Sequence, residues 1–258
     1  MKIFGFTGGL VPIGTCIVVT SGKGGTGKTT TVGAVSSCLA ALGHKTLCID
    51  CDIGLKNLDM VLGLTDFATT DFSDVLSGAL SLKEAVLEHP VIKNLSFLSA
   101  PTTLTPDEID EKLWAALIKE AKDTYDYCII DCPAGIGRGF SLAARHADMA
   151  IVVATGDGVT LRCCQRTVQE LKALGLTNIR LLMNKVKPKR FKFTRSTIDD
   201  AIDIVGAQLL GVVSEDESVV LSAASETPLA LYDSKRAAEQ FLRAAYRIKG
   251  VHLPLGKI

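Results

Sequence analysis

A glycine-rich loop near the amino terminus restricts the fold of this chain more than any other feature. Residues 22–29 read Gly-Lys-Gly-Gly-Thr-Gly-Lys-Thr and match the phosphate-loop pattern G-x-x-x-x-G-K-[ST]. A short apolar run at residues 16–20 precedes the loop, and apolar residues at helical spacing follow it over residues 29–42. This order of strand, glycine loop and helix predicts a backbone that binds phosphate at a helix amino terminus.

The loop supplies two lysines, and their positions imply different tasks. Lys28 is placed to reach the β- and γ-phosphates of a nucleotide, and the Thr29 hydroxyl is placed to bind Mg²⁺. Lys23 comes too early in the loop to do the work of Lys28. A second cation needs its own anion, and that anion can belong to another subunit.

The main rival interpretation of the loop is a dinucleotide fingerprint. Residues 22–27 also match G-x-G-x-x-G, and Asp50 and Asp52 follow at about the spacing, roughly 20 residues, of the acid that binds a ribose. A dinucleotide site has no need for a lysine and a metal-binding hydroxyl at the start of the helix. Lys28 and Thr29 therefore favour the phosphate loop.

Charge and hydropathy exclude several classes of protein. The 258 residues include 28 basic and 28 acidic ones, so no net charge draws the chain to nucleic acid or to an acidic membrane. The chain lacks an apolar run of roughly 18 residues, which a spanning helix needs. Residues 1–15 lack the pattern of a secretory signal. We expect an N-terminal extension there, either an added edge strand at residues 2–7 or the product of a misplaced start codon.

The eight cysteines indicate a reducing compartment rather than a disulfide framework. Half of them fall in expected strands or helix faces, where cysteine acts as a small apolar residue. Metal binding by cysteine is weakly indicated. We expect a cytoplasmic location, with peripheral association at the inner face of the cell membrane as the alternative.

Strand-like runs recur along the chain with helical patterns between them. Beyond the first strand, the expected strands are residues 46–50, 95–98, 127–131, 149–154, 179–184 and 209–213. This alternation predicts an α/β fold, a three-layer P-loop NTPase fold with a mostly parallel β-sheet flanked by helices. No linker or repeat is visible, so we expect one domain over residues 16–258.

Two capping boxes predict where helices start. Residues 81–84 (Ser-Leu-Lys-Glu) precede an apolar stretch through Leu87, and residues 105–108 (Thr-Pro-Asp-Glu) carry proline at the first helical position. The second helix is expected to continue to Lys122. Its predicted buried face consists of Ile109, Leu113, Ala116, Leu117 and Ala121.

Polar residues follow three of the expected strands. Asp50 and Asp52 leave a buried strand and suit the positioning of water or metal, although Asp50 could instead cap the strand end while Asp52 is solvated. Asp131 ends an apolar strand, as in a Walker B motif that holds the Mg²⁺ shell. Asn184 ends another strand, where its amide could contact a base edge. Ligands of such sheets bind beyond the carboxyl ends of the strands.

These segments resemble the MinD family, division-site ATPases of the deviant Walker A group. The resemblance rests on the two-lysine loop, on residues 50–59 (Asp-Cys-Asp-Ile-Gly-Leu-Lys-Asn-Leu-Asp) and on residues 131–136 (Asp-Cys-Pro-Ala-Gly-Ile). Residues 211–219 and 226–228 also look like this family. The resemblance extends from about residue 16 to about residue 254, and the segment after Asp52 is its most specific part.

The resemblance implies a Mg-dependent ATPase that forms a homodimer with ATP and regulates division-site placement. It implies Lys23, Lys28 and Asp52 as catalytic residues, with Lys23 reaching the partner's phosphates and Asp52 orienting water. Thr29 and Asp131 would hold Mg²⁺, and Asn184 would contact the adenine. The implied nucleotide-binding residues are Gly22, Lys23, Gly24, Gly25, Thr26, Gly27, Lys28, Thr29, Thr30 and Asn184. The implied cofactors are ATP and Mg²⁺.

The chain departs from the family at two surfaces that contact partners. The family ends in a basic amphipathic helix that lies on the membrane, whereas residues 250–258 are short and contain Pro254. Either such an anchor is lost, or the chain is truncated, or a partner recruits it. At Cys163 and Gln165 the family has acidic residues that face MinC- and MinE-type regulators, so these partners are less strongly indicated.

Two further alternatives stay open. A basic cluster at residues 185–195 could bind DNA, as in a ParA-like partition protein or a regulator of flagellar number, but a solvated loop fits the zero net charge better, so DNA binding is not expected. A redox protein like the nitrogenase iron protein would need cysteines where the chain has Ala134 and residues 101–106, and neither place has one.

Overall fold

The computed structural model describes residues 14–54, 56–187, 197–232 and 236–255, and it places an eight-stranded sheet at their centre. The strand order is β3-β4-β2-β5-β1-β6-β7-β8, and every neighbouring pair is parallel except β3 with β4. The strands are β1 (Thr15–Thr20), β2 (Thr46–Asp50), β3 (Leu87–Glu88), β4 (Leu95–Leu98), β5 (Tyr127–Asp131), β6 (Met149–Ala154), β7 (Ile179–Val186) and β8 (Gln208–Ser214).

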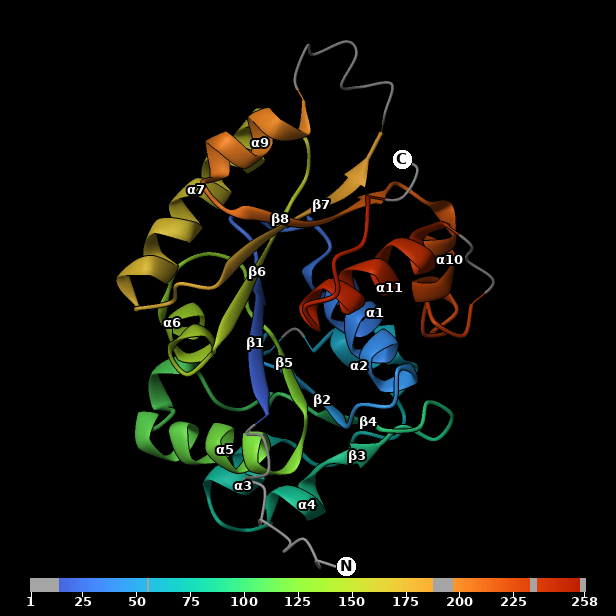
Figure 1. Cartoon of the computed structure of the whole chain (residues 1–258). Helices are drawn as coiled ribbons and strands as arrows, with labels where there is room; N and C mark the ends of the chain where they lie inside the picture. Colours follow the sequence, from blue (N-terminus) through green and yellow to red (C-terminus); the bar gives the residue numbers. More distant parts are fainter. Residues whose placement is uncertain (1–13, 55, 188–196, 233–235, 256–258) are drawn as a thin grey trace, which may run out of the picture.

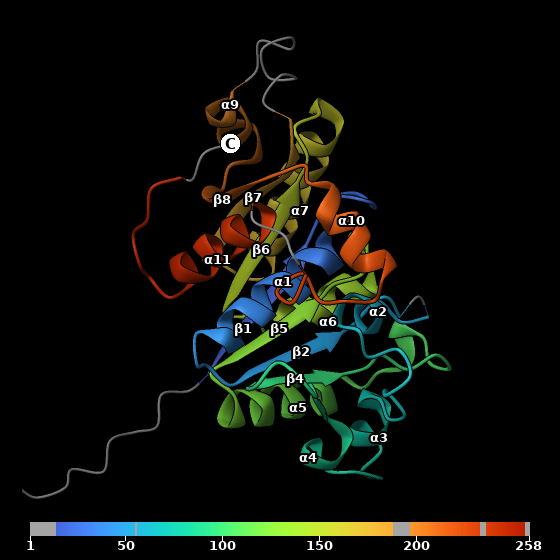
Figure 2. The same ribbon diagram turned by 90° about the vertical axis from the view of Figure 1, so that its right-hand side faces the viewer.

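Helices cover both faces of this sheet, as Figures 1 and 2 show. One face carries α1 (Lys28–Ala41), α2 (Leu58–Leu62), α10 (Glu217–Ala224) and α11 (Arg236–Ile248). The other carries α5 (Glu111–Thr124), α6 (Arg138–Arg145), α7 (Gly158–Ala173) and α9 (Ile198–Val205), while the short α3 (Phe72–Leu76) and α4 (Leu82–Ala85) lie beside α5. The predicted three-layer α/β fold is confirmed.

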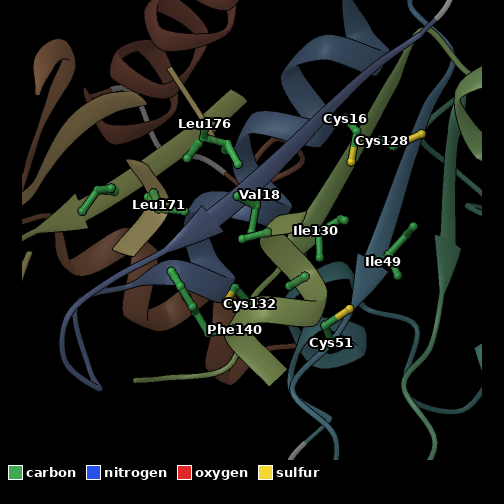
Figure 3. Close-up of a cluster of buried hydrophobic side chains, with 14 of the residues drawn as sticks. Cys16, Val18, Ile49, Cys51, Cys128, Ile130, Cys132, Phe140, Leu171 and Leu176 are labelled. Atoms are coloured by element: carbon green, nitrogen blue, oxygen red, sulfur yellow. The ribbon is translucent and has the colours of Figure 1, made fainter. Parts of the chain in front are cut away.

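The sheet is buried on both faces, and its side chains divide into two hydrophobic clusters. Along β1, Cys16 and Val18 belong to one cluster, which Figure 3 shows, and Ile17 and Val19 belong to the other. Strands with two buried faces need continuous apolar runs, which is why most strands could be recognised in the sequence. Cys48 and Cys51 have C-x-x-C spacing but fall in different clusters. All eight cysteines are described, and none forms a disulfide.

Most of the predicted strands have the predicted bounds, and one strand was missed. The expectations for β2, β4, β5 and β6 match the structure residue for residue. The box at Ser81 does cap a helix, but α4 ends at Ala85 and the backbone of Val86 is extended. The next two residues form β3, antiparallel to β4, instead of continuing the helix. Pairing along an open sheet edge replaced the local helical preference there.

The second capping box forms as predicted, but the predicted extent of the helix was wrong and its predicted buried face was only partly right, since Ile109, Leu117 and Ala121 are buried. Residues Pro106–Glu108 form only a 3₁₀ turn, and α5 begins three residues later with Asp110 as its N-cap. Leu113 is 48% exposed. The buried residues of α5 are Trp114, Leu117, Ile118 and Ala121, at the i, i+3, i+4, i+7 spacing of one helix face.

The two ends of the chain are only partly described. Residues 1–13, where the edge strand was expected, lie outside the described part, and β1 begins at Thr15. The division into an extension and one domain remains a prediction. Helix α11 is followed by residues 250–255, which fold back so that Arg247 donates a hydrogen bond to the Leu253 carbonyl. None of the described helices is long and apolar enough to span a membrane.

Candidate nucleotide site

The carboxyl ends of the central strands bring the predicted acids to the phosphate loop. Asp50 and Asp131 end neighbouring strands and are direct partners in the register of β2 with β5. Asp131 is also opposite Val19 of β1, just before the loop starts. The loop and two acid-bearing segments, distant in sequence, therefore meet at one edge of the sheet.

The loop has the backbone conformation of an anion-binding turn. Gly25 and Gly27 have φ values of 77° and 94°, in the left-handed region that favours glycine. Gly27 is the N-cap of α1 and supplies no side chain to the first N–H groups of that helix. A Cβ added at Gly24 or Gly25 would meet nothing within 4 Å, so the outer side of the loop is open. Open N–H groups at a helix start form a phosphate site.

Packing also requires glycine at two positions of the loop, Gly22 and Gly27. A Cβ at Gly22 would lie 2.3 Å from the carbonyl carbon of Cys163 in α7. A Cβ at Gly27 would lie 2.3 Å from Nδ2 of Asn184, at the end of β7. Any larger residue at either position would push the loop away from the elements that support it.

Asp131 is a buried carboxylate that lacks a full set of partners. Burial raises its pKa to about 8, and the nearby Asp50 contributes to the rise. A hydrogen bond from the Thr29 hydroxyl and the charge of Lys28 act in the opposite direction. Among the described residues, no donor reaches its Oδ1 atom. Such a carboxylate is stabilised when a cation binds beside it.

The residues around Asp131 fit Mg²⁺ rather than a metal held by protein alone. The described residues contain no group of three or more His, Cys, Asp or Glu side chains that could enclose a metal. Mg²⁺ commonly uses one or two protein oxygens and takes its other ligands from water and phosphate. The unpartnered Oδ1 of Asp131 and the adjacent Thr29 hydroxyl could supply those protein oxygens.

Asp50 and Asp52 have different environments although only one residue separates them. Asp50 is buried and accepts hydrogen bonds from the N–H groups of Asp52 at 2.8 Å and Leu58 at 3.3 Å. Burial still raises its pKa to about 6. Asp50 therefore holds the segment between β2 and α2 in place, which agrees with the alternative that it caps the end of the strand. Asp52 is half-buried, and the pKa rise caused by burial is opposed by the charge of Lys28.

The two lysines of the loop lie in different environments. Lys28 is 9% exposed and acts electrostatically on Asp52 and Asp131. Lys23 is exposed, and no described carboxylate lies within ion-pair distance of it. Burial raises the pKa of Asp157, the N-cap of α7, but hydrogen bonds from Thr155 and Thr160, with a smaller contribution from the charge of Lys23, outweigh burial and hold that pKa low at about 2.

The end of β7 contacts the loop in a way that the sequence interpretation missed. Asn184, expected to contact a base, donates a 2.9 Å hydrogen bond from Nδ2 to the Thr26 carbonyl. Lys185 was assigned to a solvated basic loop, but its ammonium donates a 2.8 Å hydrogen bond to the Gly25 carbonyl. Lys187 instead pairs with Glu215. The rest of the basic cluster, Lys189, Arg190, Lys192 and Arg195, lies outside the described residues.

Helix α7 also supports the loop. Cys164 is buried and its thiol donates a long 3.6 Å hydrogen bond to the Val153 carbonyl, whereas the half-buried Cys163 packs against Gly22. The two thiols therefore face different surroundings, as expected for neighbours on a helix. Gln165 is exposed, together with Arg162 and Arg166.

Two hollows in the described surface lie away from the phosphate loop and the acids at the carboxyl ends of the strands. One, of about 620 Å³, separates the amino ends of β7 and β8 from the folded-back residues 250–255. Another, of about 740 Å³, lies near Lys45 and Tyr125. Neither contains the loop or the acids at the carboxyl ends. The convergent groups of the candidate site lie instead at the carboxyl edge of the sheet.

The fold and these convergent groups are those of a P-loop protein, and residues 14–184 match the family described as an AAA domain. The septum site-determining protein MinD of Thermotoga maritima is 37% identical over 246 residues, which cover 94% of this chain and 91% of that protein. By these matches, the chain belongs to the MinD family.

Solved structures agree with this assignment. MinD in the MinC:MinD cell division protein complex of Aquifex aeolicus aligns with a TM-score of 0.87 at 33% identity, covering 94% of this chain and 99% of that one. The Pyrococcus horikoshii MinD, solved with Mg-ADP, aligns with a TM-score of 0.78 at 28% identity, covering 91% and 95%.

Proposed function

We propose that this protein is a Mg-dependent ATPase that dimerises with ATP and regulates the placement of the division site. The observation that carries the proposal is the register of Asp50 with Asp131 beside the two-lysine loop, because it joins a phosphate cradle to a buried acid without a full set of partners. Membership of the MinD family supports the cellular role. A ParA-like partition protein or a flagellar-number regulator is less supported, since the relatives above are MinD proteins.

The proposed catalysis depends on positioning and charge. Phosphoryl transfer requires little covalent work from the protein. Lys28 would bind the phosphates and Asp52 would orient the attacking water, because its half-buried carboxylate faces the same lysine. Thr29 and Asp131 would hold Mg²⁺, which neutralises charge on the phosphates when it is bound. Water orientation and charge stabilisation together supply most of the rate enhancement in such sites.

The second lysine supports a role for the dimer. Lys23 is exposed at the open side of the loop and has no carboxylate partner among the described residues. In the proposed dimer its ammonium reaches the phosphates bound by the other subunit. ATP would then link the two subunits, and loss of the γ-phosphate would release them.

A MinC-type regulator is the proposed partner, because a MinD relative was solved in complex with MinC. The exposed residues Arg162, Gln165 and Arg166 of α7 are neutral or basic, whereas the resemblance places acids of the family at the positions of Cys163 and Gln165, so the regulator would differ in charge from those of the wider family. The proposed location is the cytoplasm, with the inner face of the cell membrane as the alternative. Sedimentation with anionic lipid vesicles in ATP and in ADP distinguishes the two.

The test of the dimer combines light scattering with a phosphate-release assay. The wild-type protein should double its mass in ATP, but not in ADP, and should release phosphate slowly. The affinity of Lys23→Ala for ATP should be within about threefold of the wild-type affinity, because Lys28 still binds the phosphates in the same subunit. Its dimer should be at least about tenfold weaker.

Lys93→Ala is a matched control, since it removes an exposed lysine that precedes β4 at the amino edge of the sheet, away from the loop. Normal ATP-dependent dimerisation of Lys23→Ala would disprove the role across subunits. A wild-type chain that binds neither ATP nor ADP would disprove the ATPase itself.

A further inference from the structure

The end of β7 contains a backbone irregularity directed at the phosphate loop. Between Met183 and Val186, β7 advances three residues while its partner β8 advances two, from Val212 to Ser214. This is a β-bulge, a device that redirects side chains and is frequent next to active sites. Lys185 lies within it and has a φ of 53°, which is unfavourable for a long side chain.

The bulge places two donors on two consecutive carbonyls of the loop. Asn184 donates to the Thr26 carbonyl and Lys185 to the Gly25 carbonyl, across 158 and 160 residues of sequence. Asn184 is 5% exposed, and its Nδ2 atom lies 2.3 Å from the position that a Cβ at Gly27 would take. Both contacts therefore involve the backbone that must surround a phosphate.

Holding a carbonyl also orients the N–H group of the same peptide. In a trans peptide the C=O and N–H bonds point in opposite directions, and the described residues contain no cis peptide. Fixing the Gly25 carbonyl on β7 turns the Thr26 N–H away from β7, and fixing the Thr26 carbonyl does the same for the Gly27 N–H. Among the described residues, neither N–H has a backbone acceptor. Two successive donors are thus left pointing toward an anion.

We propose that Asn184 and Lys185 are positioning residues that preorganise the phosphate loop, so that the Thr26 and Gly27 N–H groups are directed at bound phosphate before the nucleotide arrives. The inference rests on the proposed ATP site and adds a role that is independent of the adenine. The strained backbone at Lys185 is consistent with this role, because strain of this kind persists at sites where geometry serves function.

Pyrophosphate separates this role from base recognition, because it has the phosphates and no base. Affinities for Mg-ADP and for Mg-pyrophosphate are measured by titration calorimetry, with thermal unfolding of each variant. Lys185→Gly removes the ammonium and relieves the left-handed backbone. It should weaken both ligands by about tenfold, the size expected for one charge-assisted hydrogen bond, with unchanged or higher thermal stability. Lys185→Arg should restore binding to within about threefold.

Lys187→Gly is the matched control, since Lys187 pairs with Glu215 outside the loop, and it should bind both ligands normally. Asn184→Ala should weaken pyrophosphate as well as ADP. If ADP alone is weakened, Asn184 contacts only the base and its positioning role is overturned. Unchanged pyrophosphate affinity in Lys185→Gly, or an equal loss in Lys187→Gly, overturns the role of Lys185. A wild-type protein that binds neither ligand would instead refute the nucleotide site.

Discussion

At the amino edge of the sheet, Asp126 and Asp148 precede β5 and β6, whereas Asp50 and Asp131 end β2 and β5 at the carboxyl edge. Asp148 accepts hydrogen bonds from the Cys16 N–H at 2.8 Å and the Lys122 ammonium at 2.7 Å. Asp126 accepts a hydrogen bond from the N–H of Lys45. The acids of the amino edge are partly exposed and join neighbouring strands and helices.

The acids of the carboxyl edge are also carboxylates, but their contribution to the stability of the fold has the opposite sign. They are buried, their pKa values are raised by burial to about 6 and about 8, and one oxygen of Asp131 has no described partner. Burying a carboxylate without full compensation destabilises the fold. The comparison teaches that the acids of one edge stabilise the chain, while the buried acids of the other reduce its stability and lie where the proposed function requires a cation and phosphates. Three predictions test this division.

The largest effect is expected for the cation of the carboxyl edge. Lys28→Ala should weaken ATP binding by at least about 100-fold, because the remaining N–H donors cannot replace a buried ammonium beside the phosphates. Titration calorimetry measures the loss. Lys45→Ala removes an exposed lysine at the amino edge and should leave the affinity unchanged. Equal losses in the two variants would show that the edges do not differ in function.

A second residue of the carboxyl edge, Asp52, should affect the hydrolysis of ATP without affecting its binding. Asp52→Ala should reduce the rate of phosphate release by at least about 100-fold, the contribution of a positioned general base or water-orienting group. ATP affinity should stay within about threefold, and the ATP-bound dimer should persist. Asp126→Ala, at the amino edge, should hydrolyse ATP at the normal rate. A normal rate in Asp52→Ala would exclude it from catalysis.

The smallest effect is expected for the free energy of unfolding. Replacing an aspartate by asparagine should raise it at the carboxyl edge and lower it at the amino edge. At pH 7, Asp131→Asn should stabilise the nucleotide-free protein by on the order of 2 kcal/mol, because the folded state must retain a proton on Asp131 that the unfolded state releases, and a neutral amide removes this difference. Asp148→Asn should destabilise it by about 1 kcal/mol through the loss of its ion pair with Lys122. Urea unfolding at several pH values measures both.

The sign of the pH dependence follows from the direction of the pKa shift. The folded pKa of Asp131, about 8, lies above its ordinary value of 3.8, so the folded state retains a proton that the unfolded state releases. Its carboxylate therefore lowers the stability progressively as the pH rises from about 4 to about 8. The gain from Asp131→Asn should vanish near pH 4 and be largest above pH 8. A gain independent of pH would contradict the buried-charge explanation.

Local patterns were sufficient for the architecture and for much of the candidate site. Buried parallel strands need continuous apolar runs, so residues 46–50 and 127–131 could be bounded without error. The prediction was weakest where tertiary contacts compete with local preference. Leu87 was expected in a helix but pairs with β4 at the edge of the sheet. Leu113 was expected to be buried, but the buried face of α5 is centred on Trp114 instead.

The sequence by itself determined the loop, the acids that end two strands and the layered fold, because each depends on residues that are neighbours in the chain. Only the tertiary structure decided that Asp50 lies opposite Asp131, and that Asn184 and Lys185 hold loop carbonyls about 160 residues away. Strand order, register and a one-residue bulge determine these contacts. They arise from how the whole sheet packs between its helices, so no local pattern encodes them.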